Sequence, residues 1–129
     1  MRLTIFLLTA LLLVLSSCDP VHDLHLENQT SKSVIVIYRP LIEIAPTGRK
    51  IESIRRNNIT YAKVVLGSGE KMRIGNVIAN YIPEVDDVEL EFLEICMERD
   101  TMKLIGKKSI LSAIQEVDKL DWRLVLRDK

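Results

Sequence analysis

The sequence predicts a mainly β protein: an antiparallel β-sandwich of about seven to eight short strands, with one helix before the last strand. Short runs of alternating or β-branched residues recur along the chain, and Gly, Pro, Asn and Ser separate them. Helical spacing of apolar residues is clear in one segment, near the C-terminus. Residues 24–129 are expected to form a single domain.

The first strands are predicted from the region that ends at Tyr38. Leu24–Glu27 alternates between apolar and polar residues, residues 28–32 favour a turn, and Ser33–Tyr38 is rich in β-branched residues. We expect these segments to form a hairpin. The apolar residues within 41–44 favour a short strand, and Arg49–Arg56 is interpreted as an irregular, partly exposed connection.

The middle of the chain predicts a second hairpin. Ile59–Leu66 has the composition of a strand, Gly67-Ser68-Gly69 favours a turn, and Glu70–Val77 has the composition of a returning strand. Residues 80–87 contain Pro83 and are predicted to form a loop.

A third pair of strands is predicted between Val88 and Ile105. Val88–Met97 starts with strict alternation, which slips by one residue where Phe92 and Leu93 are both apolar. A β-bulge produces such a slip, and burial of both faces of the strand is the alternative. Residues 98–100 favour a turn, and Thr101–Ile105 is the expected return strand.

A helix over residues 109–120 is predicted because Ile110, Leu111, Ile114, Val117 and Leu120 share one helical face. Lysines precede this segment and acidic residues lie near its end, which is unfavourable for the helix dipole. The helix is therefore expected to depend on packing. Trp122–Arg127 is the last expected strand, with Trp122 packed under the helix.

The N-terminus has the pattern of a secretory signal. Arg2 precedes an apolar run from Ile5 to Leu15, and Ser16, Ser17 and Cys18 follow. The run is shorter than the roughly 20 apolar residues that a spanning helix needs. An ordinary cleaved signal is the alternative, but plain cleavage sites usually read Ala-x-Ala. The residues Leu15-Ser16-Ser17-Cys18 resemble the lipobox of bacterial lipoproteins.

The resemblance implies where the protein is found. Residues 1–17 would be a signal peptide that is cut between Ser17 and Cys18, and Cys18 would carry an S-diacylglycerol and an N-acyl group. Residues 18–23 would be the lipidated anchor and a short spacer. The chain would then be lipid-anchored to the cell membrane or outer membrane of a Gram-negative bacterium, facing the periplasm or the cell surface. Asp19 and Asp23 are compatible with either membrane.

Composition and cysteine content narrow the class of protein. The chain has 18 basic and 18 acidic residues, so the balance of charge gives no indication of a nucleic-acid partner. If Cys18 is acylated, Cys96 has no partner for an internal disulfide. Its apolar setting favours a buried, unreactive thiol. The expected partners are the membrane, through the anchor, and an envelope protein.

No metal or cofactor site is predicted. Asp19, His22, Asp23 and His25 are the densest group of potential ligands, but two histidines three apart on a strand point to opposite faces. The carboxylates between Glu84 and Glu94 lack the glycine of a calcium loop. Gly106-Lys107-Lys108-Ser109 lacks the spacing of a phosphate loop.

One modification site is suggested by Asp100-Thr101-Met102. It resembles the Asp-Ser/Thr-aliphatic acceptor of periplasmic O-glycosylation, so Thr101 is a candidate O-glycosylation site. The predicted turn at residues 98–100 would expose it.

The sequence favours a non-catalytic binding or assembly module over an enzyme. Both histidines lie near the anchor, and the G-x-S-x-G motif is absent. A small hydrolase-type envelope enzyme that uses carboxylates or lysines is one alternative. A glycan-binding surface protein is another, although the candidate aromatic residues are few and scattered: Tyr38, Tyr61, Tyr81 and Trp122.

Overall fold

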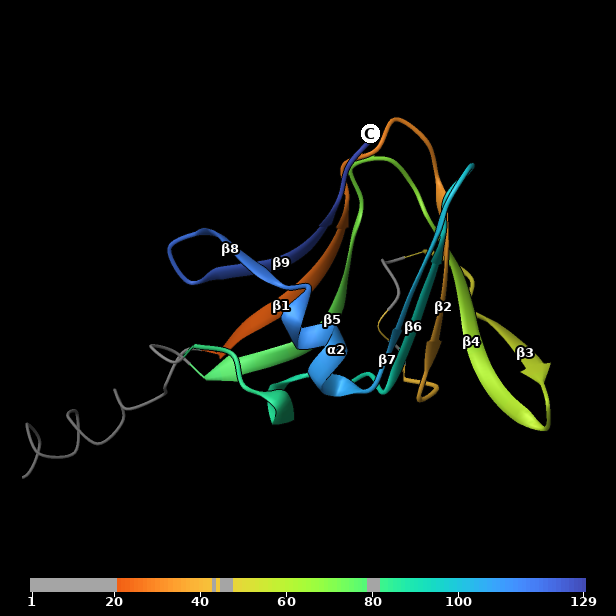
Figure 1. The fold of residues 1–129 in the computed structure, drawn as a ribbon, viewed down its shortest axis with the longest axis horizontal. Helices are drawn as coiled ribbons and strands as arrows, with labels where there is room; N and C mark the ends of the chain where they lie inside the picture. The colour runs from red at the N-terminus through yellow and green to blue at the C-terminus, as the bar shows by residue number, and fades with distance from the viewer. Residues whose placement is uncertain (1–20, 43, 45–47, 79–81) are drawn as a thin grey trace, which may run out of the picture.

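The protein is a two-layer β-sandwich, described here for residues 21–42, 44, 48–78 and 82–129 of a computed structural model. One sheet has four strands in the order β5-β1-β9-β8, and the other has five in the order β3-β4-β2-β6-β7. Figure 1 shows the two sheets close together at the top and farther apart at the bottom, where the helix lies. The mainly β sandwich predicted from the sequence is confirmed.

The four-stranded sheet combines strands from both ends of the chain. β1 pairs with β5 in the antiparallel sense and with β9 in the parallel sense, and β8 pairs with β9 as an antiparallel hairpin. Its strands are β1 (Val21–Asn28), β5 (Lys71–Ile78), β8 (Gln115–Asp118) and β9 (Asp121–Leu126).

The five-stranded sheet is antiparallel throughout. β2 lies at its centre between β4 and β6, and the outer strands are β3 and β7. Its strands are β2 (Val34–Arg39), β3 (Glu52–Arg56), β4 (Ile59–Leu66), β6 (Phe92–Cys96) and β7 (Thr101–Ile105).

Alternate residues of both sheets fill one core between the layers. Leu24 and Leu26 of β1, like Val36 and Tyr38 of β2, are fully buried. Burial of such side chains is the main force that holds the two sheets together. The remaining members of this cluster are Val34, Ile44, Ala62, Val64, Leu66, Met72, Ile74, Val77, Val88, Leu90, Leu93, Ile95, Ile110, Leu124 and Leu126.

Two predicted hairpins are wrong, because their strands belong to different sheets. β1 and β2 are joined by residues 29–33, and β4 and β5 by residues 67–70, and each connection arches from one layer to the other. Strands on either side of an arch bury alternate residues just as hairpin strands do. The alternation in the sequence therefore could not distinguish an arch from a turn within one sheet.

The predicted helix over 109–120 is also wrong in its extent. Helix α2 covers only Lys107–Ser112, and residues 115–118 form β8, which pairs with β9. As a strand, this segment forms its backbone hydrogen bonds with β9. As a helix, it would have formed them within itself, with unfavourable charges at both ends. The turn between the two strands places Leu120 at φ 61°.

The predicted irregular connection over Arg49–Arg56 contains a strand. β3 pairs with β4 through the two-residue turn Asn57-Asn58, whose φ values are 49° and 63°. Asparagine tolerates positive φ, and a turn with two such residues matches the twist of a hairpin. The short strand expected within 41–44 is not formed by Leu41, Ile42 or Ile44, and Glu43 lies outside the described residues.

Two further expectations are corrected near the strand ends. The slip at Phe92 and Leu93 is not a bulge, because β6 begins at Phe92 and pairs with β2 and β7 in unbroken register. β1 begins at Val21, so residues 21–23 belong to the sheet and not to a spacer. The hairpin of β6 and β7, and the last strand, follow the prediction.

The segment that follows β5 covers part of the edge of the four-stranded sheet. It contains the short 3-10 helix η1 (Val85–Asp87), and Val88 then bridges to Gly75. Glu89 donates its backbone N–H to the carbonyl of Ile74 at 3.0 Å. Within the described ranges, no helix has the length and apolar content needed to cross a membrane.

Candidate functional site

A pocket at one end of the sandwich is the candidate binding site. Three segments line it. They are residues 30–34, which comprise most of the β1–β2 connection (the first arch) and the start of β2; residues 97–102 at the turn between β6 and β7; and the C-terminal residues 125–129. Its volume is about 650 Å³. We call it the end pocket. These segments meet because β1, β6 and β9 all finish at this end of the sandwich, and β2 and β7 start there.

The floor of the end pocket is apolar. Val34 and Leu126 are buried core residues, and the side chains of Met97, Met102 and Val125 are half-buried. Methionine is unbranched and polarizable, so it adapts to apolar groups of different shapes. The floor therefore suits an apolar part of a ligand.

The rim of the end pocket is charged, and contacts between segments hold it in place. Lys32 forms an ion pair with Glu98 at 2.6 Å, and Lys129 forms one with Asp100 at 2.5 Å. Asp128 accepts the backbone N–H of Ser31 at 2.9 Å. These groups are exposed, so their ion pairs position the rim more than they stabilise the fold.

The carboxylates of the rim are engaged. The hydrogen bond and charge of Lys129, with the backbone N–H of Thr101, hold the pKa of Asp100 below its usual range. The same contact raises the pKa of Lys129. A carboxyl group that acts as a general acid at neutral pH needs a raised pKa. Because the pKa of Asp100 is lowered, Asp100 is better suited to remain a charged carboxylate than to transfer protons.

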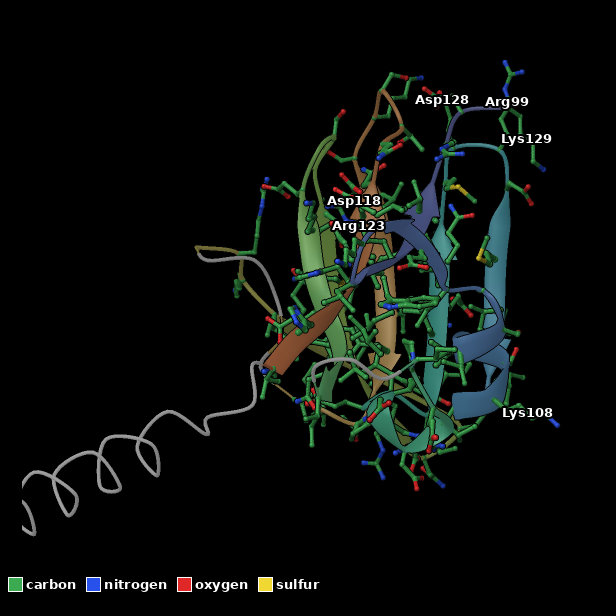
Figure 2. The ribbon with its side chains drawn as sticks, turned by 90° about the vertical axis from the view of Figure 1, so that its left-hand side faces the viewer. Arg99, Lys108, Asp118, Arg123, Asp128 and Lys129 are labelled. Atoms are coloured by element: carbon green, nitrogen blue, oxygen red, sulfur yellow. The ribbon has the colours of Figure 1, made fainter. Side chains whose placement is uncertain are left out.

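Two arginines of the rim have no carboxylate partner. Among the described residues, Arg99 makes no hydrogen bond or ion pair, and Arg127 reaches only the amide oxygen of Gln29 at 3.4 Å. Figure 2 shows Arg99 at the same end of the molecule as Asp128 and Lys129. A guanidinium group binds a carboxylate or phosphate through two parallel hydrogen bonds. The end pocket thus places two available cations around an apolar floor.

The first arch owes its shape to one buried asparagine. The side-chain amide of Asn28 donates to the carbonyls of Lys32 at 2.8 Å and Leu66 at 3.0 Å. Its oxygen accepts from the backbone N–H of Thr30 at 3.0 Å, and Ser68 donates to the carbonyl of Thr30 at 2.6 Å. These bonds fasten the two arches to each other, which fixes the pocket wall that residues 30–34 form.

A second hollow, of about 350 Å³, lies at the four-stranded sheet. Arg123 lines it and forms an ion pair with Glu27 at 2.8 Å and two hydrogen bonds with Asp121. Figure 2 shows Arg123 away from both ends of the molecule. Arg123 is already bound by two carboxylates, which raise its pKa. Its guanidinium group is therefore less available to a ligand than the arginines of the end pocket.

The candidate metal ligands that the structure describes do not form a metal-binding cluster. His22 and His25 lie three residues apart on β1, and both border the second hollow together with Asp23. Burial lowers the pKa of His25, which favours its neutral form. Asp23 is exposed, and Asp19 lies outside the described residues. In the part of the chain that the structure describes, no cluster of three or more His, Cys, Asp or Glu side chains could hold a metal ion.

The other sequence-predicted residues are separate from one another. Ser17 and Cys18 lie outside the described residues. Thr101 is exposed at the start of β7, beside the rim of the end pocket. Cys96 is half-buried, not buried as expected, because it lies on the outward face of β6. Its Sγ is 3.8 Å from a carboxylate oxygen of Glu94.

The aromatic residues within the described ranges do not form a shared platform for a sugar. Tyr38 is buried in the core, and Tyr61 packs against Phe92 with ring centroids 5.0 Å apart. Trp122 is half-buried against the core on β9. Tyr81 lies outside the described residues.

Sequence reasoning missed the residues of the end pocket. Lys32, Arg99 and Arg127 come from three distant segments, and each looks like an ordinary exposed residue in the sequence. Their shared location follows from strand direction and sheet order. The predicted hairpin of β1 and β2 would place both strands in one sheet. It therefore gave no indication that their connection crosses between the sheets and closes the end of the sandwich.

No protein-family model, curated protein or solved structure matches this chain.

Proposed function

We propose that this chain is a lipid-anchored, non-catalytic binding module of a bacterial envelope. Cys18 carries the lipid, and the end pocket binds an amphipathic anion, a molecule with an apolar body and a carboxylate or phosphate group. The observation that carries the proposal is the pair of arginines without carboxylate partners, Arg99 and Arg127, at the rim of an apolar floor.

The two parts of the pocket account for the two parts of the ligand. The methionines Met97 and Met102 contact the apolar body, and the guanidinium groups bind the anionic group. The carboxylates of the rim are held by Lys32, Lys129 and the backbone of Ser31. This arrangement supports binding better than the alternative of a small hydrolase, which needs a carboxylate or lysine free to transfer protons.

The anchor and the pocket lie at opposite ends of β1. Cys18 precedes Val21 by three residues, and β1 runs from Val21 to Asn28, whose neighbour Thr30 lines the pocket. At about 3.3 Å per residue, a strand of this length spans about 25 Å. The end pocket would therefore face away from the membrane, where it is accessible to a ligand or to an envelope partner that carries the anionic group.

The test uses the acylated protein in nanodiscs with labelled methionine methyl groups. Addition of 2-naphthoate, an amphipathic anion, should shift the NMR signals of Met97 and Met102. The double variant Arg99→Gln/Arg127→Gln should bind at least about tenfold more weakly, because charged hydrogen bonds are lost. The control is Lys50→Gln/Arg55→Gln, which removes two exposed cations outside the pocket. Unshifted methionine signals, or equal weakening in both double variants, would contradict the proposal.

A further inference from the structure

We propose that the end of the sandwich opposite the end pocket rests on the lipid bilayer. This end, which we call the basal end, is where β1 and β4 begin and where β2, β5 and β7 finish. The inference rests on the proposed lipid anchor and adds a second membrane contact, made by the folded domain itself. Figure 1 shows the basal end at the bottom, with the start of β1 and the end of β5 side by side.

Exposed apolar side chains gather at the basal end. Ten large apolar residues are exposed in the described part of the chain, and the three that lie elsewhere are Ile35, Val65 and Val117. The seven at the basal end are Val21, Leu41, Ile59, Ile78, Ile82, Val85 and Ile105. The most exposed of the ten are Ile82 at 74% and Ile105 at 70%.

The register of the strands brings several of these residues together. Val21 pairs with Ile78 across β1 and β5, and Ile82 follows four residues later in the chain. Ile105 is the last residue of β7, at the same end of the other sheet. Exposed apolar residues concentrated at one end of a domain mark a contact with a partner or a membrane.

The position of the anchor identifies the partner as the bilayer. Cys18 lies three residues before Val21, and three extended residues span about 10 Å at most. Acyl chains on Cys18 would therefore hold the start of β1 within that distance of the lipid. Apolar side chains this close can enter the boundary between headgroups and acyl chains.

The charges of the basal end favour a neutral lipid surface. Lys107 and Lys108 of α2 lie there, and Figure 2 shows Lys108 at the opposite end of the molecule from Arg99 and Lys129. The acidic residues Asp86 and Asp87 of η1 offset them. The contact is thus expected to depend on apolar insertion and not on anionic lipids, so phosphatidylcholine vesicles are a sufficient test surface.

The experiment measures whether lipid reaches the basal end. Single cysteines carry an NBD fluorophore at Ile82→Cys or Ile105→Cys in acylated Cys96→Ser protein bound to phosphatidylcholine vesicles. The controls carry the probe at Val117→Cys, an exposed apolar position elsewhere, and at Arg99→Cys, at the end pocket. Nitroxide-labelled lipid should quench roughly half of the fluorescence at residues 82 and 105, where shallow insertion is expected, and little at the controls.

The other outcomes overturn the inference in distinguishable ways. If the protein is recovered with the vesicles but all four probes are equally unquenched, the basal contact is wrong and the anchor stands. A blue-shifted but unquenched probe at residue 82 or 105 would indicate that protein, such as a second copy, covers the basal end. If the protein is not recovered with the vesicles, both the anchor and the basal contact fail.

Discussion

The side-chain amide of Asn28 donates a hydrogen bond to the carbonyl of Leu66 at 3.0 Å, although the two residues belong to different sheets. Asn28 ends β1 and Leu66 ends β4, so this bond fastens the first arch to the second. Asn28 is fully buried, and its side chain makes its contacts with main-chain and hydroxyl groups that the arches leave unpaired. It therefore determines the shape of the end of the sandwich that holds the pocket.

Replacement of Asn28 should destabilise the fold. Asn28→Ala leaves the carbonyl of Leu66 and the N–H of Thr30 without their partner, and each unpaired buried group costs about 1–3 kcal/mol. We expect a loss of about 2–4 kcal/mol in the free energy of unfolding, measured with urea. Gln29→Ala, at the exposed neighbouring position, should change it by less than about 0.5 kcal/mol. Equal effects of the two variants would refute the role given to Asn28.

The sequence predicted the layers better than the connections between them. Alternation in Leu24–Glu27 and the β-branched run Ser33–Tyr38 correctly indicated two strands. These patterns gave no information on whether the two strands pair in one sheet or lie in different sheets, because both arrangements bury the same residues. The hydrogen bonds of Asn28 stabilise the arch, and one of them reaches the carbonyl of Leu66, 38 residues away in the sequence.

The errors near the C-terminus have a similar physical cause. Ile114, Val117 and Leu120 recur at helical spacing, but pairing of residues 115–118 with β9 prevails over that local pattern. Asn57-Asn58 did carry a signal, since two adjacent asparagines favour a two-residue hairpin turn. That signal would have placed β3 correctly.

The contact between Gly75 and the η1 segment is a second stability test. A Cβ atom at Gly75 would lie 2.1 Å from the carbonyl oxygen of Asp87. Gly75→Ala should therefore push η1 away from β5 and cost about 1–3 kcal/mol. The matched variant Gly67→Ala meets only the movable side chains of Glu70 and Arg49 and should cost less. Thermal unfolding compares them, and a Gly75→Ala protein as stable as wild type would contradict this packing.

Glu94 should make stability depend on pH. Its carboxylate lies on the outward face of β6 but is almost fully covered, and it forms ion pairs with Arg56 at 2.9 Å and Lys103 at 3.2 Å. Burial raises the pKa of Glu94, but the hydrogen bonds from Arg56 and Lys103 outweigh burial and hold the pKa below its ordinary value of 4.5. Because the folded pKa is lowered, the ion pairs stabilise the protein above pH 4.5, and this stabilisation is lost as the pH falls through the folded pKa.

Urea unfolding at several pH values tests this account of Glu94. Glu94→Gln should lower the free energy of unfolding by about 1–2 kcal/mol at pH 7, and the difference from wild type should shrink below pH 4.5. Glu52→Gln removes an exposed ion pair to Lys63 and should have a much smaller effect. A difference for Glu94→Gln that is the same at pH 7 and at pH 3 would show that the carboxylate charge does not contribute.

The proposed lipid on Cys18 would determine both which end of the sandwich meets the membrane and which end presents the pocket. Mass spectrometry of the mature protein from membranes should find Cys18 as the first residue, with a diacylglycerol on sulfur and an acyl group on nitrogen. Cys18→Ser should carry no lipid and keep residues 1–17, whereas the control Cys96→Ser should be processed as wild type. A mature protein that begins at another residue without lipid, or a Cys18→Ser variant that is cleaved normally and stays with membranes, would contradict the account.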